Sequence, residues 1–321
     1  MPDSLENPAA LNQAGLEALC QAEPWHAQRL FQRAFVAAPT ELGLLVNVRL
    51  ALQQTGRDQA ASRSYMAASQ QPSCRGSALK NLGFLKLWQG EPVAGWDLHH
   101  QRFNQPELMA RHWQGEPVDT PLVVWNDVGQ GDAIQFSRYL PLLVRRGLRV
   151  HLAVQPNLIP LFAANLPAGI TVISHHDAPW EQADAHLPLM GLMRQLDADL
   201  GWGSNHVQPY LTADGEANDL PPRSGRGRLG LCWRSNPEDR SLYLSKSMPL
   251  AALWGHAGWQ EPLEHLDLIS LQRGAQAEHR QWASRFAAVL PERAGWLHTA
   301  RWIASCDWVL SVDTAVAHLA D

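Results

Sequence analysis

The sequence predicts helical repeats followed by two α/β units built on parallel sheets. Three observations predict this fold class. Apolar and small residues recur every 34 residues through the first hundred positions, strand and helix patterns alternate from Pro121 onward, and the polar stretch 211–228, rich in Gly and Pro, divides this alternation in two. The expected domains of the 321-residue chain are 1–104, 105–215 and 216–321.

The 34-residue spacing divides the first domain into three repeats, at about 8–41, 42–75 and 76–104. Each repeat is expected to be a helix pair that buries its apolar face on the next repeat, with Gly or Ala where the helices cross. This pattern resembles the tetratricopeptide repeat. It implies either a surface for a protein or peptide partner or a structural collar on the next domain. The recurring sets are Leu11, Leu45 and Leu79; Ala22, Gly56 and Gly90; and Ala27, Ala61 and Gly95.

The two α/β units are predicted from short β-rich runs separated by helical spacing. Such alternation is typical of parallel, doubly wound sheets, whose ligands lie at the carboxyl ends of the strands. The first unit is expected to hold strands at 122–126, 148–154, 169–174 and within 183–192, with helices at 132–147 and 156–166; the second holds strands at 228–233, 266–271 and 308–312, with helices near 249–256, 276–288, 298–305 and 315–319.

Composition excludes several classes of function. The net charge of −5 and the absence of a Lys/Arg-rich run argue against nucleic acid or an anionic membrane as partner. No run approaches the roughly 18 apolar residues of a membrane span, and the acidic N-terminus is no signal peptide, so we expect a cytoplasmic protein. The cysteines are scattered, which indicates reduced thiols and no metal site: Cys20, Cys74, Cys232 and Cys306.

The loop after the first predicted strand reads "NDVGQGD". Gly129 and Gly131 allow a tight turn and a close backbone approach, and Asp132 lies where the next helix begins. Asp132 either caps that helix or has a chemical role. A dinucleotide fingerprint would need a third glycine near position 134, which is Ile134, and no Walker sequence is present. A nicotinamide enzyme is therefore disfavoured.

Two further loops carry candidate ligand-binding residues. The stretch 233–250 holds Arg234, Arg240 and Lys246, which could neutralise a diphosphate or could simply be solvated charges. Gln272, after the next strand, could read a base or ribose edge or could be a turn residue.

The last predicted strand ends in the turn Asp313-Thr314, which leads into a helix. The free N–H groups of a helix start can bind anions, so this corner is a candidate phosphate site. Asp313 is expected as the helix cap, and the hydroxyl of Thr314 and the ring of His318 could add hydrogen-bond donors. A histidine in a helix is also often without any such role.

Four segments, taken in order, resemble bacterial proteins that join tetratricopeptide repeats to a family-9, heptosyltransferase-like glycosyltransferase of the GT-B fold. GT-B enzymes consist of two Rossmann-like domains, of which the first takes the acceptor and the second the nucleotide sugar. The segments are "GQGDAIQFSRYLPLL" (129–143), "VQPYL" (207–211), "SKSMPL" (245–250) with "SLQRG" (270–274), and "VDTAVAHLA" (312–320).

The resemblance implies an inverting transfer that needs neither metal nor cofactor, with a nucleotide-diphosphate sugar as donor substrate. Asp132 then corresponds to the catalytic base and Lys246 to the residue that contacts the donor diphosphate, with Arg234 as a further candidate. Thr314, Ala315 and His318 correspond to the segment that binds the donor phosphates.

The chain departs from the family pattern at three points. "NDVGQGD" replaces the usual "EQGLGD", "RSNPEDR" lacks the glycine of "SGNP", and the family continues beyond "HLA", so a C-terminal truncation is expected. The alternative function is a non-catalytic scaffold in which the repeats bind a partner and the GT-B domain is degenerate. Whether Asp132, Lys246 and His318 face one site discriminates between the two.

Overall fold

The chain forms two compact units. The first comprises Met1–His112, Met193–Ser204 and Glu238–Ser245, and the second comprises Trp113–Leu192, Asn205–Pro237 and Lys246–Asp321. The predicted division into three domains remains a prediction. The computed structural model describes residues 7–21, 23–38, 44, 47–48, 51–52, 56–103, 109–179, 183–196, 209–215, 217, 219–235, 246–255 and 257–321.

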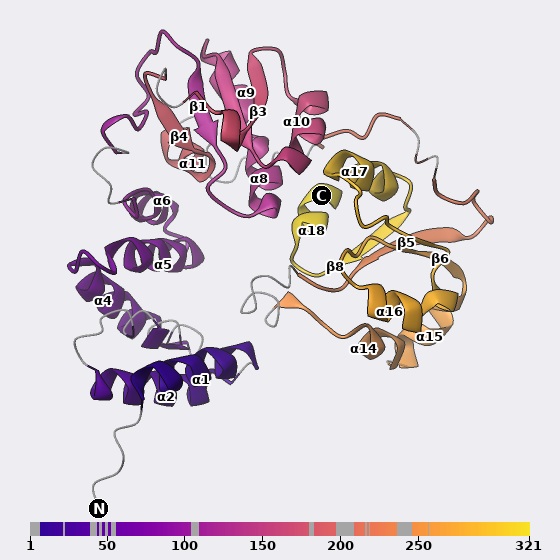
Figure 1. The fold of residues 1–321 in the computed structure, drawn as a ribbon, viewed down its shortest axis with the longest axis horizontal. Coiled ribbons are helices and arrows are strands. Elements are labelled where there is room, and N and C mark those ends of the chain that lie inside the picture. Colours follow the sequence, from indigo (N-terminus) through magenta and orange to yellow (C-terminus); the bar gives the residue numbers. More distant parts are fainter. Residues whose placement is uncertain are drawn as a thin grey trace, which may run out of the picture. The chain divides into compact units, whose positions relative to one another are not determined.

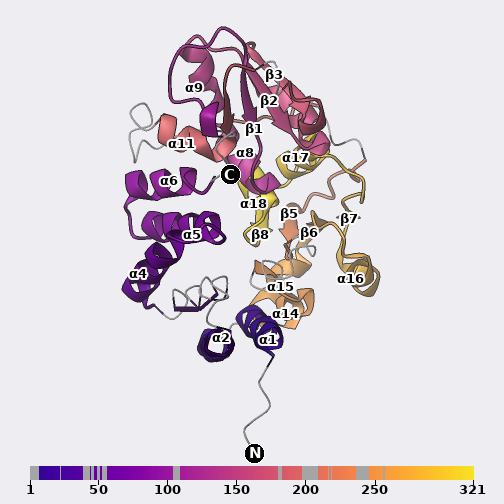
Figure 2. The ribbon, with the colours of Figure 1, turned by 60° about the vertical axis from the view of Figure 1, so that its left-hand side comes forward.

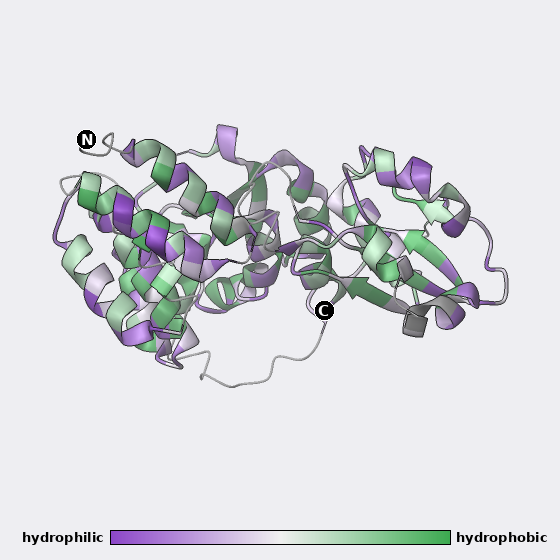
Figure 3. Cartoon of the chain, turned by 90° about the horizontal axis from the view of Figure 1, so that it is seen from below, coloured by the Kyte–Doolittle hydropathy of each residue, from purple (hydrophilic) through white to green (hydrophobic). Residues whose placement is uncertain are grey.

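The first unit is helical, and its helices carry hydrophobic and hydrophilic residues side by side (Figure 3). Three of the helices start with proline in the first turn, where the missing N–H would have had no helical partner. The side-chain oxygen of Asn7 also caps the first helix by accepting from the Ala9 N–H at 3.0 Å. The helices of this unit (Figure 1) are α1 (Pro8–Cys20), α2 (Pro24–Ala37), α4 (Asp58–Ser69), α5 (Arg75–Trp88) and α6 (Pro92–His100).

Small residues lie where these helices meet, which confirms that part of the prediction. A Cβ atom at Gly15 in α1 would lie 2.4 Å from the ring of Phe31 in α2. A Cβ atom at Gly83 in α5 would lie 2.8 Å from the carbonyl oxygen of Gly95 in α6. Glycine therefore permits both close approaches. The assignment of these helices to the tetratricopeptide repeat remains a prediction.

Helix α6 ends in two buried histidines. His99 is 2 % exposed and His100 is 5 % exposed. Nδ1 of His99 lies 2.9 Å from Nη1 of Arg102, so this nitrogen accepts and the ring is neutral. Burial, helped by the positive charge of Arg102, lowers the pKa of His99 to about 3. Burial, helped by Arg194, lowers the pKa of His100 to about 4.

These lowered pKa values predict that the chain loses stability in mild acid. Below a pH of about 6.5 the unfolded chain protonates both histidines while the folded chain does not, so the free energy of unfolding falls as the pH falls toward 4. The expected uptake on unfolding at pH 5 is roughly one proton for each histidine. Urea denaturation between pH 7 and pH 5 measures it.

Replacing one of the two buried rings tests the assignment. His100→Gln should reduce the pH dependence of unfolding by about one proton. His26→Gln, which removes an exposed histidine of the same unit, is the matched control for the substitution itself. An equal pH dependence in wild type and His100→Gln contradicts the account.

Within the residues that the structure describes, the second unit contains two four-stranded sheets in which all pairs are parallel. The first has strand order β3-β2-β1-β4, and its central strand β1 is buried along most of its length. Buried residues on both faces explain why apolar runs predicted these strands. Its elements are β1 (Leu122–Trp125), α8 (Gln130–Ser137), α9 (Leu140–Arg145), β2 (Val150–Val154), η1 (Pro156–Leu158), α10 (Ile159–Asn165), β3 (Ile170–Ser174), η2 (His175–Asp177), β4 (His186–Pro188), η3 (Leu189–Gly191) and α11 (Leu192–Gln195).

The second sheet repeats the same topology, with order β7-β6-β5-β8. Its core packs Leu229, Leu231 and Trp233 against residues of the flanking helices. The predicted incompleteness of this half remains an expectation. Its elements are β5 (Gly227–Cys232), α14 (Leu250–Gly255), α15 (Ala257–Glu264), β6 (Leu266–Ser270), α16 (Gln276–Gln281), η4 (Ala283–Arg285), β7 (Ala288–Val289), α17 (Trp296–Ala304), β8 (Trp308–Ser311) and α18 (Ala315–Ala320).

Two predicted helices were wrong in extent, and one predicted strand, though it lies within the expected range, is short. The single helix expected at 132–147 is two helices, because Pro141 lies in the first turn of α9 and cannot donate to a continuing α8. The helix expected at 276–288 ends at Gln281, and Ala288 and Val289 form the edge strand β7. The strand expected within 183–192 is only three residues long.

Candidate functional site

The candidate site lies where the strand order of each sheet reverses. In both sheets the first strand has its second strand on one side and its fourth on the other, and open parallel sheets bind ligands at this point, beyond the carboxyl ends of the strands. The loop after β1 leads to Asp132, the loop after β5 begins at Trp233, and the loop after β8 holds Asp313. The topology thus places the predicted loops at the positions where such sheets bind ligands.

Asp132 occupies the third position of α8, and the cap residue is Gly129. The carboxyl group of Asp132 accepts a hydrogen bond from the Gly129 backbone, so it supports the helix start without being the cap itself. Burial raises the pKa of this carboxyl, while the charges of His318 and Lys246 act in the opposite direction. Asp132 is therefore a half-buried carboxyl group with the charges of His318, Lys246 and Asp313 nearby.

Gly131 is required for the contact between α8 and α18, which lie side by side in both views (Figures 1 and 2). A Cβ atom at this position would lie 2.9 Å from Cδ2 of His318 and 3.1 Å from Cα of Ala315. Because one of these atoms is backbone, a side chain here would force the helices apart. The glycine predicted for close approach thus brings the start of α8 against the start of α18.

Asp313 forms an ion pair with Lys246, with Oδ2 of the aspartate 2.7 Å from Nζ of the lysine. Its other carboxylate oxygen lies 3.9 Å from Nε2 of His318. Asp313 is not the cap of α18 as expected; that position belongs to Thr314, whose extended backbone precedes the helix. Thr314 Oγ1 lies 3.2 Å from the hydroxyl oxygen of Ser311.

Arg234 and Gln272 have partners within the protein. Arg234 Nη2 lies 3.0 Å from Oε2 of Glu278 in α16, so its charge is neutralised locally. Gln272 is buried, and its Oε1 accepts from the backbone N–H groups of Trp233 at 3.1 Å and Arg234 at 2.8 Å. Its Nε2 donates to the carbonyl oxygen of Arg273. Gln272 therefore shapes the loop after β5.

Sequence reasoning missed three residues whose side chains form hydrogen bonds beside the Asp132 turn: Gln130, Asn157 and Trp296. Gln130 Oε1 accepts from Nε1 of Trp296 at 2.6 Å and from Nδ2 of Asn157 at 3.0 Å. The signal was the position of Gln130 between the two glycines. Its partners are far away in the chain, and nothing in their own segments marks them.

Some predicted segments lie outside the described residues. These are Arg240, Ser245 and the start of the "VQPYL" segment at 207–208. Tyr210 from that segment is described, and its hydroxyl donates to the carbonyl oxygen of His318 at 3.3 Å.

No group of three His, Cys, Asp or Glu side chains suited to hold a metal ion occurs in the part of the chain that the structure describes. Within the same residues, no helix is long and apolar enough to cross a membrane.

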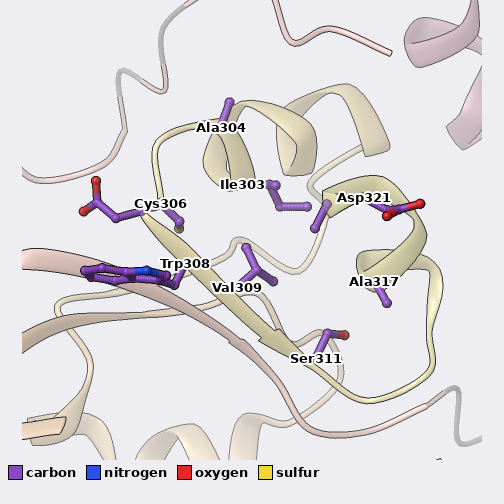
Figure 4. A pocket seen from close by; sticks show the side chains of 10 residues that line it. Ile303, Ala304, Cys306, Trp308, Val309, Ser311, Ala317 and Asp321 are labelled. Atoms are coloured by element: carbon purple, nitrogen blue, oxygen red, sulfur yellow. The ribbon is translucent and has the colours of Figure 1, made fainter. Parts of the chain in front are cut away.

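An open groove of about 500 Å³ runs beside β8, the edge strand of the second sheet (Figure 4). Its lining includes Trp308, which is 58 % exposed, together with Val309 and Ala317. Asp132, Lys246 and His318 do not line it.

Comparison with known proteins yields only distant similarity. No protein-family model matches the sequence, and no curated protein matches it. Solved structures that match include heptosyltransferase II of Escherichia coli, with 15 % identity over 63 % of this chain and 81 % of that chain and a TM-score of 0.42. The E. coli heptosyltransferase WaaC bound to ADP-2-deoxy-2-fluoro heptose has 14 % identity over 63 % and 85 %, with a TM-score of 0.38.

A further match is an O-GlcNAc transferase of Thermobaculum terrenum. It has 15 % identity over 98 % of this chain and 74 % of that chain, with a TM-score of 0.36. All three similarities are too distant to assign this chain to a family. What the chain does therefore has to follow from its own residues.

Proposed function

We propose that this chain is a glycosyltransferase of GT-B type that moves a sugar from a nucleotide-diphosphate sugar to an acceptor hydroxyl, with inversion and without a metal. One observation carries the proposal. Asp132, Lys246 and His318 come from three separate segments, yet they interact electrostatically at the carboxyl ends of the two sheets. The charges of Lys246 and His318 act on the pKa of Asp132, and both side chains lie close to the carboxylate of Asp313. These are also the residues that the sequence resemblance assigns to the reaction.

Each residue has a role that its surroundings support. Asp132, half-buried and with a raised pKa, takes the proton from the acceptor hydroxyl. That oxygen attacks the anomeric carbon as the bond to the diphosphate breaks. Lys246 and His318 then stabilise the negative charge that develops on the leaving phosphates. Because α18 has only six residues, we assign this role to side chains, aided by the Thr314 hydroxyl and the Ala315 N–H, and not to a helix dipole.

The ion pair between Lys246 and Asp313 is compatible with that role. The Asp313 side chain is 62 % exposed and that of Lys246 is 36 % exposed, so the pair contributes little to stability. A phosphate can therefore replace the aspartate at small cost. Gln272 supports the loop after β5 by accepting hydrogen bonds from its backbone, including that of Arg234.

For the helical unit we propose a surface that binds a peptide or protein partner. This proposal rests on the 34-residue spacing.

Release of nucleoside diphosphate tests the proposed function. The chain is incubated with UDP-, GDP-, ADP- and CDP-sugars, with a mixture of hydroxyl acceptors, and free diphosphate is measured. Release from one nucleotide class, above the rate of a chain denatured beforehand, supports the proposal. A folded chain that releases none would favour a non-catalytic scaffold.

A further inference from the structure

The turn that carries Asp132 is held by hydrogen bonds to Gln130, one of which comes from helix α17 beside the second sheet. Helix α8 begins at Gln130, two positions before Asp132, and the Gln130 side chain accepts two hydrogen bonds. One comes from Asn157 in η1, which follows the neighbouring strand β2. The other, at 2.6 Å, comes from the indole N–H of Trp296, the first residue of α17.

The side chain of Trp296 is itself held in position by burial and by contact with Arg273. It is 7 % exposed, and the guanidinium carbon of Arg273 lies 4.9 Å from the centroid of its ring. Arg273 also donates to Oγ1 of Thr299 at 3.2 Å, one turn further along α17. Since Arg273 directly follows Gln272, the same loop that shapes the carboxyl end of β5 also supports Trp296. These contacts hold the indole N–H in place as a donor at the start of α17.

We infer that Trp296 is a positioning residue: its N–H holds Gln130 and thereby fixes the turn of Asp132 relative to Lys246 and His318. The inference rests on the proposed function, because the rate of sugar transfer is the quantity that depends on the position of Asp132. Fixing the first residue of α8 restricts the third, which lies in the same helical turn. Catalytic groups tolerate little displacement, and a shift of about 1 Å can cost roughly 100-fold in rate.

Trp296→Phe tests the hydrogen bond, because phenylalanine keeps an aromatic ring beside Arg273 and removes the donor together with part of the ring volume. We expect kcat for diphosphate release to fall roughly 10- to 100-fold, with nucleoside diphosphate affinity unchanged within about twofold. Gln130→Leu removes the same hydrogen bond and also the one from Asn157, so its loss should be at least as large. The double variant should lose no more than Gln130→Leu alone, since that substitution already removes the acceptor of the indole N–H.

Trp302→Phe is the matched control. Trp302 lies on the same helix and is also buried, but its indole N–H donates to Asp219 at 2.9 Å, away from the Asp132 turn. It should lower stability about as much as Trp296→Phe and leave kcat unchanged. The pH profile gives a second readout: moving Asp132 away from the positive groups should shift the acid limb of kcat to higher pH in Trp296→Phe alone.

The outcomes separate the two claims. A wild-type chain that releases no diphosphate removes the proposed function and this inference together. An active wild type with an equally active Trp296→Phe variant overturns only the inference. So do rate losses that multiply in the double variant, or an equal loss of kcat in Trp302→Phe.

Discussion

Asp132→Asn is expected to lower sugar transfer by roughly 100- to 10,000-fold, because the carboxamide cannot take the proton of the acceptor hydroxyl. Its oxygen can still accept the hydrogen bond from the Gly129 backbone, so α8 should start as before. Binding of the nucleoside diphosphate should be retained. Initial rates of diphosphate release and calorimetric titration measure the two effects separately.

The raised pKa of Asp132 adds a pH dependence to this prediction. The base acts only when deprotonated, so wild-type kcat should fall as the pH is lowered through that pKa, at a higher pH than an ordinary carboxyl would give. The matched control is Asp177→Asn, which removes an exposed carboxylate just after β3 in the same sheet. Unchanged turnover in Asp132→Asn, or an equal loss of turnover in Asp177→Asn, would contradict the assignment of Asp132 as the catalytic base.

Lys246→Ala should weaken binding of the nucleoside diphosphate by about 10- to 100-fold and leave nucleoside binding unchanged. A charge-assisted hydrogen bond to phosphate has this magnitude, and the nucleoside has no phosphate to lose it. The removed amine also leaves the Asp313 carboxylate without its lysine partner beside the phosphates, which adds repulsion. Titration with the diphosphate and with the nucleoside gives both affinities.

Lys86→Ala is the control for this prediction. Lys86 is also ion-paired, to Glu91 at 2.9 Å, but it belongs to the helical unit. It should change neither affinity. An equal loss of diphosphate and nucleoside binding in Lys246→Ala would show that the lysine supports the fold of the site and does not contact phosphate.

Much of the fold could be predicted from local patterns. The strands of both sheets are short apolar runs, and the close contact of α5 with α6 includes Gly95, which the 34-residue spacing marked. The exceptions also have local causes. A proline divides one predicted helix, and β7 has only two residues, too few for any periodicity to show.

The site was less predictable because its geometry depends on contacts between distant segments. The motifs marked Asp132, Lys246 and His318, and the structure brings them together. No motif indicated that Glu278 neutralises Arg234, or that Gln130 meets Trp296 across 166 positions of sequence. Such partners are chosen by tertiary packing, which a linear pattern does not encode.

Calorimetric titration of the full chain with UDP, GDP, ADP and CDP tests most directly whether Lys246, Asp313 and His318 form a diphosphate site. We predict that one of the four binds with micromolar affinity and that His318→Ala abolishes this binding. If a chain shown to be folded binds none of them, the diphosphate site is contradicted and the transferase proposal falls with it.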